Sequence, residues 1–121
     1  MTAPNIAGLA TVTGKTVALN LSNTSFTDVL ANAASSNKVL KINSLIVSNV
    51  DGNSAAAISV FLQRSGQNSF HFAKNIDVPA ETTLIVISKD TQVYLEEDDK
   101  IQANASNGND LNILCSYEEI S

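Results

Sequence analysis

The chain has 121 residues, of which 44% are hydrophobic and 16% charged, and it carries a net charge of −5 with a pI near 4.5. This length suits one domain with its own hydrophobic core, and the apolar content is too high for a disordered chain. The one arginine and the dispersed lysines form no basic patch for phosphate contacts. Nucleic-acid binding and docking on an anionic membrane are therefore disfavoured.

The first dozen residues, 1–12, are small and polar and show no strand pattern. We expect an N-terminal arm here, either frayed or lying along a neighbouring molecule, followed by one domain over residues 13–121. The segment Met1 to Ala10 lacks the basic and apolar regions of a secretory signal peptide. No apolar stretch approaches the roughly 20 residues of a membrane-spanning helix. We expect neither export nor a membrane partner.

Beyond the arm, runs rich in Val, Ile, Leu, Phe and Thr recur about every 8–12 residues between Gly, Asn, Asp and Ser, which is typical of a β-sandwich or barrel. Tight turns are expected at Asp51-Gly52 and over Asn107–Asp110, and Pro79 ends a strand. The predicted strands are Lys15–Leu21, Ser25–Ala31, Lys38–Asn49, Ala56–Arg64, Ser69–Ile76, Thr82–Ser88, Gln92–Leu95, Lys100–Ala105 and Leu111–Glu118. The pattern predicts an all-β fold: a single antiparallel β-sandwich of about 8–9 short strands, with jelly-roll or immunoglobulin-like connectivity left open.

Alternation along each strand assigns side chains to the two faces of the sheets. The predicted core rows are Leu40, Ile42 and Ile46; Ile58, Val60 and Leu62; Phe70, Phe72 and Ile76; and Leu111, Ile113, Cys115 and Tyr117. Five large hydrophobic residues fall out of phase with these rows and are expected to point outward. They form the candidate partner interface: Leu45, Val47, Phe61, Tyr94 and Leu114.

The titratable groups are too few and too dispersed for catalysis. The only histidine, His71, is expected to point outward as an ordinary surface residue, and Cys115 to pack in the core. The acidic run Glu96–Asp99 is interpreted as a solvated turn. A Ca²⁺ site is disfavoured because consecutive carboxylates lack the alternate ligand spacing of a calcium loop. We expect no catalytic, metal or cofactor site, and hence no enzyme.

Three stretches together resemble a known family: Lys38–Asn49, Val78–Ile87, and Val93–Gln102 with the ending Cys115–Ser121. Their order resembles small β-sandwich virion proteins of tailed bacteriophages, particularly phages of marine bacteria and cyanobacteria. In that family a strand ends in VSN, a later loop reads VPA, and a YLEEGD turn introduces the last hairpin. The resemblance spans roughly Lys38 to Ser121. Asp98 stands where the family often has Gly, and Asp tolerates a positive φ better than most residues.

The resemblance implies a virion structural protein: a capsid decoration, a neck or collar part, or a tail accessory component. Its partners are then other virion proteins and further copies of itself, assembled in the host cytoplasm. An alternative is a tail-fibre recognition module that binds a host glycan or receptor. Asn107, Asn109 and Asp110 provide polar loop side chains for that role. Trp is absent, however, and of the tyrosines only Tyr94 is expected to point outward, so the aromatic part of such a site is missing. An enzyme is disfavoured, because the adjacent Glu96 and Glu97 point to opposite sides and cannot share a substrate.

Overall fold

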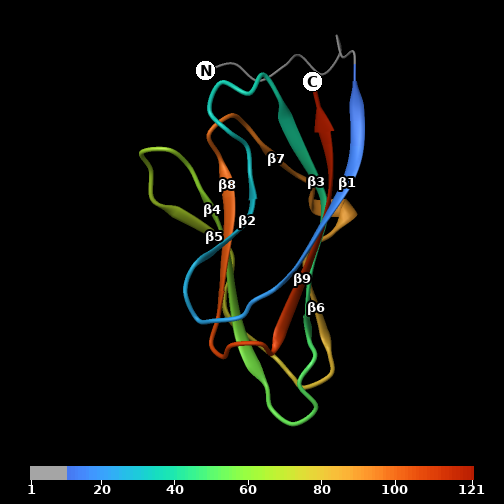
Figure 1. Ribbon diagram of the computed structural model, residues 1–121, viewed down its shortest axis with the longest axis vertical. Helices are drawn as coiled ribbons and strands as arrows, with labels where there is room; N and C mark the ends of the chain where they lie inside the picture. The colour runs from blue at the N-terminus through green and yellow to red at the C-terminus, as the bar shows by residue number, and fades with distance from the viewer. Residues whose placement is uncertain (1–10) are drawn as a thin grey trace.

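The computed structural model describes residues 11–121, which form two antiparallel β-sheets packed face to face (Figure 1). Sheet A contains, in spatial order, β1 (Val12–Asn20), β9 (Leu111–Ile120), β3 (Val39–Asn49) and β6 (Thr83–Ile87), and β7 (Val93–Leu95) also pairs with β3. Sheet B contains, in spatial order, β2 (Thr27–Ala31), β8 (Lys100–Ala105), β4 (Ala56–Gln63) and β5 (Ser69–Val78). The prediction of an antiparallel β-sandwich is confirmed, with all nine strands present.

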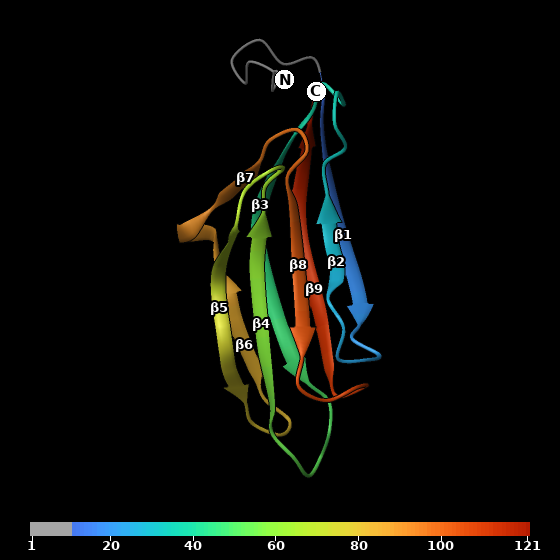
Figure 2. The ribbon, with the colours of Figure 1, turned by 90° about the vertical axis from the view of Figure 1, so that its left-hand side faces the viewer.

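The strand order brings segments far apart in the sequence side by side. Sheet B lies in front in Figure 2, with β4 and β8 at its centre and β5 and β2 at its edges. In sheet A, β9 separates β1 from β3, and a short 3-10 helix, η2 (Lys89–Thr91), joins β6 to β7. Near its start β1 meets the end of the chain, where the N–H of Thr11 donates to the carbonyl of Ser121 at 3.1 Å. Among residues 11–121, no helix has the length and hydrophobicity to span a bilayer.

The hydrophobic core lies between the two sheets. The predicted core rows on β4 and β9 are confirmed where alternation is uninterrupted: Ile58, Val60, Leu111, Ile113 and Cys115 are fully buried. At the margin of the same core, Leu62 and Tyr117 are half-buried. Because successive side chains point to opposite faces of a strand, the remaining positions of β4 and β9 face outward.

The predicted alternation fails midway along β3. Pairing with β9 shifts register between Ile42 and Ser44, so that one extra residue bulges out of the strand. A bulge exchanges the inward and outward positions of the residues that follow it. The prediction that Leu45 and Val47 point outward is therefore wrong, since both are fully buried in the core. For the same reason Ile46, predicted to be inside, lies on the outer side of sheet A.

The predicted core row on β5 is only partly correct. Phe72 packs against the core, but Phe70 is 51% exposed and Ile76 is 42% exposed. β5 is an edge strand, and its pairing with β4 shifts register between Ile58 and Val60 and again beyond Val60. An edge strand that bulges has a neighbour on one side only, so its apolar side chains are incompletely covered.

The predicted arm over residues 1–12 lies almost entirely outside the described residues. Within them, Val12 already belongs to β1 and pairs with Ile120. The strand therefore begins before the expected domain boundary at residue 13, and the arm itself stays a prediction.

Candidate functional site

The structure divides the predicted partner interface among three places. Leu114 and Tyr94 lie on the outer face of sheet A, 43% and 41% exposed. Phe61 lies on the outer face of sheet B, where other side chains of the same chain cover it. The two remaining residues, Leu45 and Val47, belong to the core. Only the sheet A pair therefore offers an exposed apolar surface as predicted.

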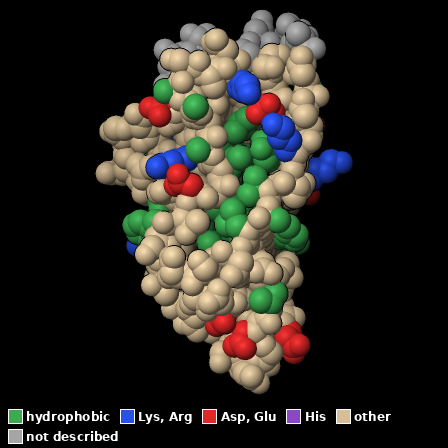
Figure 3. Space-filling model, in the orientation of Figure 1, with side chains coloured by type: hydrophobic (Ala, Val, Ile, Leu, Met, Phe, Trp, Pro, Cys, Tyr) green, Lys and Arg blue, Asp and Glu red, His purple; other side chains and the backbone are tan. Residues whose placement is uncertain are grey.

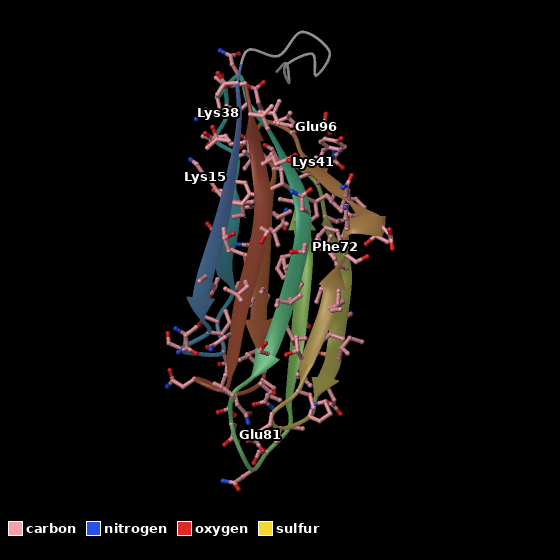
Figure 4. All side chains as sticks on the ribbon, turned by 90° about the vertical axis from the view of Figure 1, so that its right-hand side faces the viewer. Lys15, Lys38, Lys41, Phe72, Glu81 and Glu96 are labelled. Carbon is pink, nitrogen blue, oxygen red and sulfur yellow. The ribbon has the colours of Figure 1, made fainter. Side chains whose placement is uncertain are left out.

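Four apolar side chains lie in one line across the outer face of sheet A, which faces the viewer in Figure 4. Cross-strand pairing places Ala18 of β1 opposite Leu114 of β9, Leu114 opposite Ile46 of β3, and Ile46 opposite Ile85 of β6. Ile85 is 65% exposed. We call these four residues the apolar row. Sequence alternation found only Leu114, because the bulge in β3 hides Ile46 and because Ile85 was not assigned to a face.

A shallow hollow of about 500 Å³ lies beside the apolar row. Its lining includes Ala18 and Leu114 of the row together with Asn20, Asn112, Ser48 and Val50. The hollow is open to solvent and carries no charged side chain in its lining. It therefore suits an apolar side chain with polar groups at its margin better than an ionic ligand.

Uncharged polar rows flank the apolar row on both sides. On one side, the hydroxyls of Ser48 and Thr83 hydrogen-bond to each other at 3.0 Å. On the other side, the hydroxyls of Thr16 and Ser116 lie 3.4 Å apart. The polar pairs are cross-strand partners, one on β3 and β6 and the other on β1 and β9. The centre of this face is thus apolar with a neutral, hydrogen-bonding border.

The next row toward the chain ends is charged. Lys41 of β3 and Glu118 of β9 are cross-strand partners whose side chains form an ion pair at 3.8 Å. Tyr94 of β7 stands opposite Lys41 on its other side, and Gly14 of β1 stands opposite Glu118. This charged row runs Gly14, Glu118, Lys41, Tyr94 from β1 to β7. Its two charges are side by side and of opposite sign.

The acidic turn Glu96–Asp99 is held by Arg64, which follows β4. Its Nη2 donates to Oε2 of Glu96 at 2.7 Å and lies 3.3 Å from Oδ2 of Asp99. Oδ2 of Asp99 also accepts the backbone N–H of Glu96 at 3.0 Å. Burial raises the pKa of the Asp99 carboxyl above its ordinary value, although that backbone hydrogen bond and the Arg64 guanidinium oppose the rise. These contacts bind two turns of the fold to each other.

The prediction of a solvated turn holds for only part of this segment. Glu97 and Asp99 are almost fully buried, and Oε2 of Glu97 accepts the backbone N–H of Asn37 at 2.7 Å. Asp98 has φ of +70°, in the left-handed region that glycine adopts most freely. Two of the carboxylates thus face protein groups and not solvent. In the described part of the chain no group of three or more His, Cys, Asp or Glu side chains is placed to hold a metal ion.

His71 and Cys115, the one histidine and the one cysteine of the chain, lie on different sheets. His71 is exposed on β5, as predicted, and its ring lies 5.1 Å from that of Phe61. Cys115 is buried, as predicted, and burial raises the pKa of its thiol to about 11. A thiol with that pKa is almost wholly protonated at neutral pH and is a poor nucleophile.

An aromatic cluster on the outer face of sheet B was not found from the sequence. Phe26, 68% exposed, packs edge-on against Phe61 with ring centroids 5.4 Å apart. Phe61 also contacts His71, its cross-strand partner. Beside it, Nε2 of Gln102 donates to Oδ1 of Asp28 at 2.7 Å. Phe61 was expected to point outward, but its contact with Phe26 depends on the pairing of β2 with β8 and of β8 with β4, which local pattern does not give. The expectation that the aromatic part of a glycan site is missing is therefore wrong.

The core also reaches the surface along the seam between β1 and β2, where the chain passes from sheet A to sheet B. Figure 3 shows hydrophobic side chains gathered in a stripe along this side of the molecule. On β1, Val17 and Leu19 are half-buried and pack against the core. This seam is an extension of the core, whereas the apolar row lies on the opposite side of sheet A.

No family model and no curated protein sequence matches the chain. The solved structures that are similar in fold include the following two. One is a chain from the Bacillus endospore appendages, a family of disulfide-linked pili, with a TM-score of 0.52 and 10% identity, covering 100% of this chain and 96% of that one. The other is a chain from the acid-stable capsid of Helicobacter pylori bacteriophage KHP30, with a TM-score of 0.51 and 10% identity, covering 93% of this chain and 90% of that one. At such identity the likeness establishes a shared sandwich fold.

Proposed function

We propose that the protein is a non-enzymatic structural subunit of a tailed-bacteriophage virion, acting as a capsid decoration, a neck or collar part, or a tail accessory component. The observation that carries the proposal is the apolar row, a line of hydrophobic side chains across an outer sheet face. Exposed apolar surface bordered by polar residues is typical of protein–protein contacts. Its partners are other virion proteins and copies of the same chain, assembled in the host cytoplasm.

The strand order supports this proposal. β1-β9-β3-β6 packed on β2-β8-β4-β5 is the order of two interleaved Greek keys, from which we infer a jelly roll. Jelly rolls recur in viral capsid domains. The two similar solved structures come from a phage capsid and from pili, both of which are assemblies of repeated subunits. The resemblance of residues Lys38 to Ser121 to phage virion proteins points in the same direction.

The chemistry of the described residues also favours a structural role. The buried carboxylates of Glu97 and Asp99 accept backbone N–H groups, and the Cys115 thiol is protonated within the core. These groups stabilise turns and packing, which is a structural role and not that of a reactive group. Binding through an exposed face requires no such group.

Purified virions of the phage that encodes the chain test the proposal. Mass spectrometry of density-gradient particles is expected to find the protein at a fixed ratio to the major capsid protein. Its position on the head, neck or tail follows from immunogold labelling of the same particles. Absence of the protein from intact virions, with its presence in the infected-cell lysate, contradicts the proposal.

A second candidate function is host recognition by a tail fibre, with a glycan as the ligand. The aromatic cluster of Phe26, Phe61 and His71 supports it, because sugars stack their C–H faces on aromatic rings while side chains such as Gln102 and Asp28 hydrogen-bond the hydroxyls. A glycan array screened with the intact protein and with Phe26→Ala tests this candidate. Binding that is lost in the variant supports it, and no binding by the intact protein rejects it.

A further inference from the structure

We propose that the outer face of sheet A binds the same face of a second copy of this chain, related by a two-fold axis that runs parallel to the strands between β9 and β3. The inference rests on the proposed structural function and names its first partner. It is carried by the apolar row and the charged row, because the side chains of each are complementary when the row faces a copy of itself in the opposite order. Figure 4 looks directly onto the face, with β1, β9, β3 and β6 from left to right.

The geometry of such an axis decides which residues meet. Rotation by half a turn exchanges β1 with β6 and β9 with β3, while each row stays at its own level along the strands. A residue on β1 then faces a residue on β6 of the second copy, and a residue on β9 faces one on β3. This is the isologous contact of a two-fold dimer, in which each pair of facing residues occurs twice.

Across this axis the apolar row faces the same row of the second copy in the opposite order, and the side chains that meet are complementary in size. Ala18 faces Ile85 of the second copy, and Leu114 faces Ile46. Ile85, the most exposed of the three large side chains in the row, therefore meets the smallest residue, Ala18. Beside Ala18 and Leu114 lies the hollow of about 500 Å³, which can receive the projecting isoleucine. A projecting apolar side chain entering a hollow with an apolar wall is the usual anchor of an interface.

Across the same axis the charged row faces its copy in the opposite order, and charges of opposite sign meet. Glu118 of one copy faces Lys41 of the other, so that each dimer has two interchain ion pairs of opposite charges. At the ends of the same row, Gly14 faces Tyr94, again the smallest residue against a large exposed one. Charge complementarity of this kind fixes the register of two surfaces more than it adds affinity.

The competing two-fold axis, along the apolar row itself, fits less well. It reverses the direction along the strands and sets Lys41 and Glu118 opposite the other end of the face. There Val50, an exposed hydrophobic residue, follows the end of β3. Lys41 would then face Val50, and Glu118 would face Asp110, whose backbone is hydrogen-bonded to that of Val50. A charge against an apolar side chain and two like charges against each other are both unfavourable.

The size of the face is sufficient for a reversible dimer. Four strands about 4.8 Å apart and four rows about 6.7 Å apart cover roughly 500 Å² of projected area on each copy. Two copies together bury about 1,000 Å², the size at which specific interfaces begin, and two sheets stack face to face with their strands within about 30° of each other. We therefore expect a dimer whose population depends on protein concentration.

Sedimentation equilibrium of the full-length chain over a wide concentration range tests the proposal. The expected result is a monomer–dimer equilibrium in which Ile85→Lys and Leu114→Lys each raise the dissociation constant by about tenfold or more, because a lysine is buried without a partner. Phe70→Lys, at an equally exposed apolar residue of sheet B, is the matched control and should leave dimerisation unchanged. Thermal melts of the three variants check that each remains folded.

A mixing experiment tests the direction of the axis. Lys41→Glu places two negative charges on one copy, and Glu118→Lys places two positive charges on the other. Across the proposed axis each homodimer sets like charges against each other, whereas the heterodimer pairs every charge with its opposite. When equal amounts of the two variants are mixed, random pairing would make half of all dimers heterodimers. Native mass spectrometry should show a heterodimer fraction well above one half. Repulsion within a chain cannot produce this preference, because two heterodimers contain the same chains as one homodimer of each kind, so the intrachain contribution cancels.

Two results overturn the proposal: a protein that stays monomeric at every concentration, or a dimer that tolerates both Ile85→Lys and Leu114→Lys. Statistical mixing of the charge variants overturns the proposed axis. These failures are separate from failure of the proposed function. A monomer that is nevertheless present in virions contacts a different virion protein, and a dimer that is absent from virions keeps this interface while losing the proposed role.

Discussion

Arg64 and Glu96 are 32 residues apart in sequence, yet Nη2 of the first donates to Oε2 of the second at 2.7 Å. Arg64 directly follows β4, and Glu96 directly follows β7, so the contact links sheet B to sheet A at one end of the sandwich. The same guanidinium lies 3.3 Å from the almost fully buried carboxylate of Asp99. One cation therefore contacts two carboxylates of the turn that leads into β8.

Replacing Arg64 with Met should destabilise the fold by about 1–3 kcal/mol, because the buried Asp99 carboxylate then has no cation nearby. Urea denaturation measures this free energy of unfolding. The matched control is Lys100→Met, which breaks the more exposed pair with Asp28 at 3.7 Å and should cost less than about 0.5 kcal/mol. An equal loss of unfolding free energy in the two variants would mean that the burial of Asp99 does not make its contact with Arg64 more stabilising than an exposed ion pair.

Glu119 should make stability depend on pH in the acid range. It lies 3.4 Å from the ammonium groups of both Lys15 and Lys38. Although partial burial acts in the opposite direction, the two lysines lower the pKa of its carboxyl below the ordinary 4.5. A carboxyl with a lowered folded-state pKa stabilises the protein above its unfolded pKa and loses that contribution as the pH falls through the folded-state value.

Glu119→Gln should accordingly cost about 0.5–1 kcal/mol at pH 7, the range of exposed ion pairs, and progressively less as the pH falls below 4.5. Denaturation curves of both proteins from pH 7 to pH 2 provide the measurement. Glu81→Gln, at an exposed carboxylate without an ion pair in the described part of the chain, should show no such trend. A difference between Glu119→Gln and the parent that stays constant with pH would exclude the lysines as its cause.

Cys115 should react with a thiol reagent only when the protein opens. Burial raises the pKa of the thiol from 9.0 to about 11, which alone lowers its thiolate fraction about 100-fold at pH 8. Because the thiol is also fully buried, the reagent cannot reach it until the protein opens. The labelling rate in buffer should therefore be at least about 100-fold below the rate in denaturant, with free cysteine as the reference thiol. A fast reaction in buffer would place Cys115 near the surface.

Sequence alternation predicted the fold well where strands are regular. All nine strands and the core rows on β4 and β9 follow from local pattern, because each side chain's face depends on its own strand alone. It failed where one residue bulges, at Ile42 to Ser44, since a bulge leaves no mark in a pattern of apolar residues. Because of this one extra residue, Ile46 was predicted to be in the core and Leu45 on the outer face, whereas the structure has them the other way round.

The candidate surface was less accessible to sequence reasoning than the fold. Tyr94 and Leu114 were predicted to be outward, and they are, but the apolar row exists only because β1 pairs with β9 and β9 with β3. Those pairings join Ala18 to Leu114 and Leu114 to Ile46 over long stretches of chain. Local pattern gives the face of each residue, and the register between distant strands decides which of them become neighbours.

The conformation of Asp98 gives a final test of the turn between β7 and β8. Its φ of +70° lies in the left-handed region, which an L-residue with a Cβ adopts at a cost and glycine adopts freely. Asp98→Gly should therefore stabilise the fold by up to about 1 kcal/mol, reduced by the greater freedom of glycine in the unfolded chain. Asp98→Val should destabilise it by about 1–2 kcal/mol, since a β-branched residue is poorly tolerated there.

Gly66, with φ of +69°, provides the matched control in the turn between β4 and β5. A Cβ at this position would meet no atom within 4 Å, so the cost of Gly66→Ala, about 1 kcal/mol, reports the backbone conformation alone. Urea denaturation of the three variants gives the comparison. If Asp98→Val were as stable as the parent while Gly66→Ala lost stability, the turn at Asp98 would have to adopt another conformation in solution. The placement of Arg64 against Glu96 and Asp99 would then change with it, because both carboxylates are positioned by that turn.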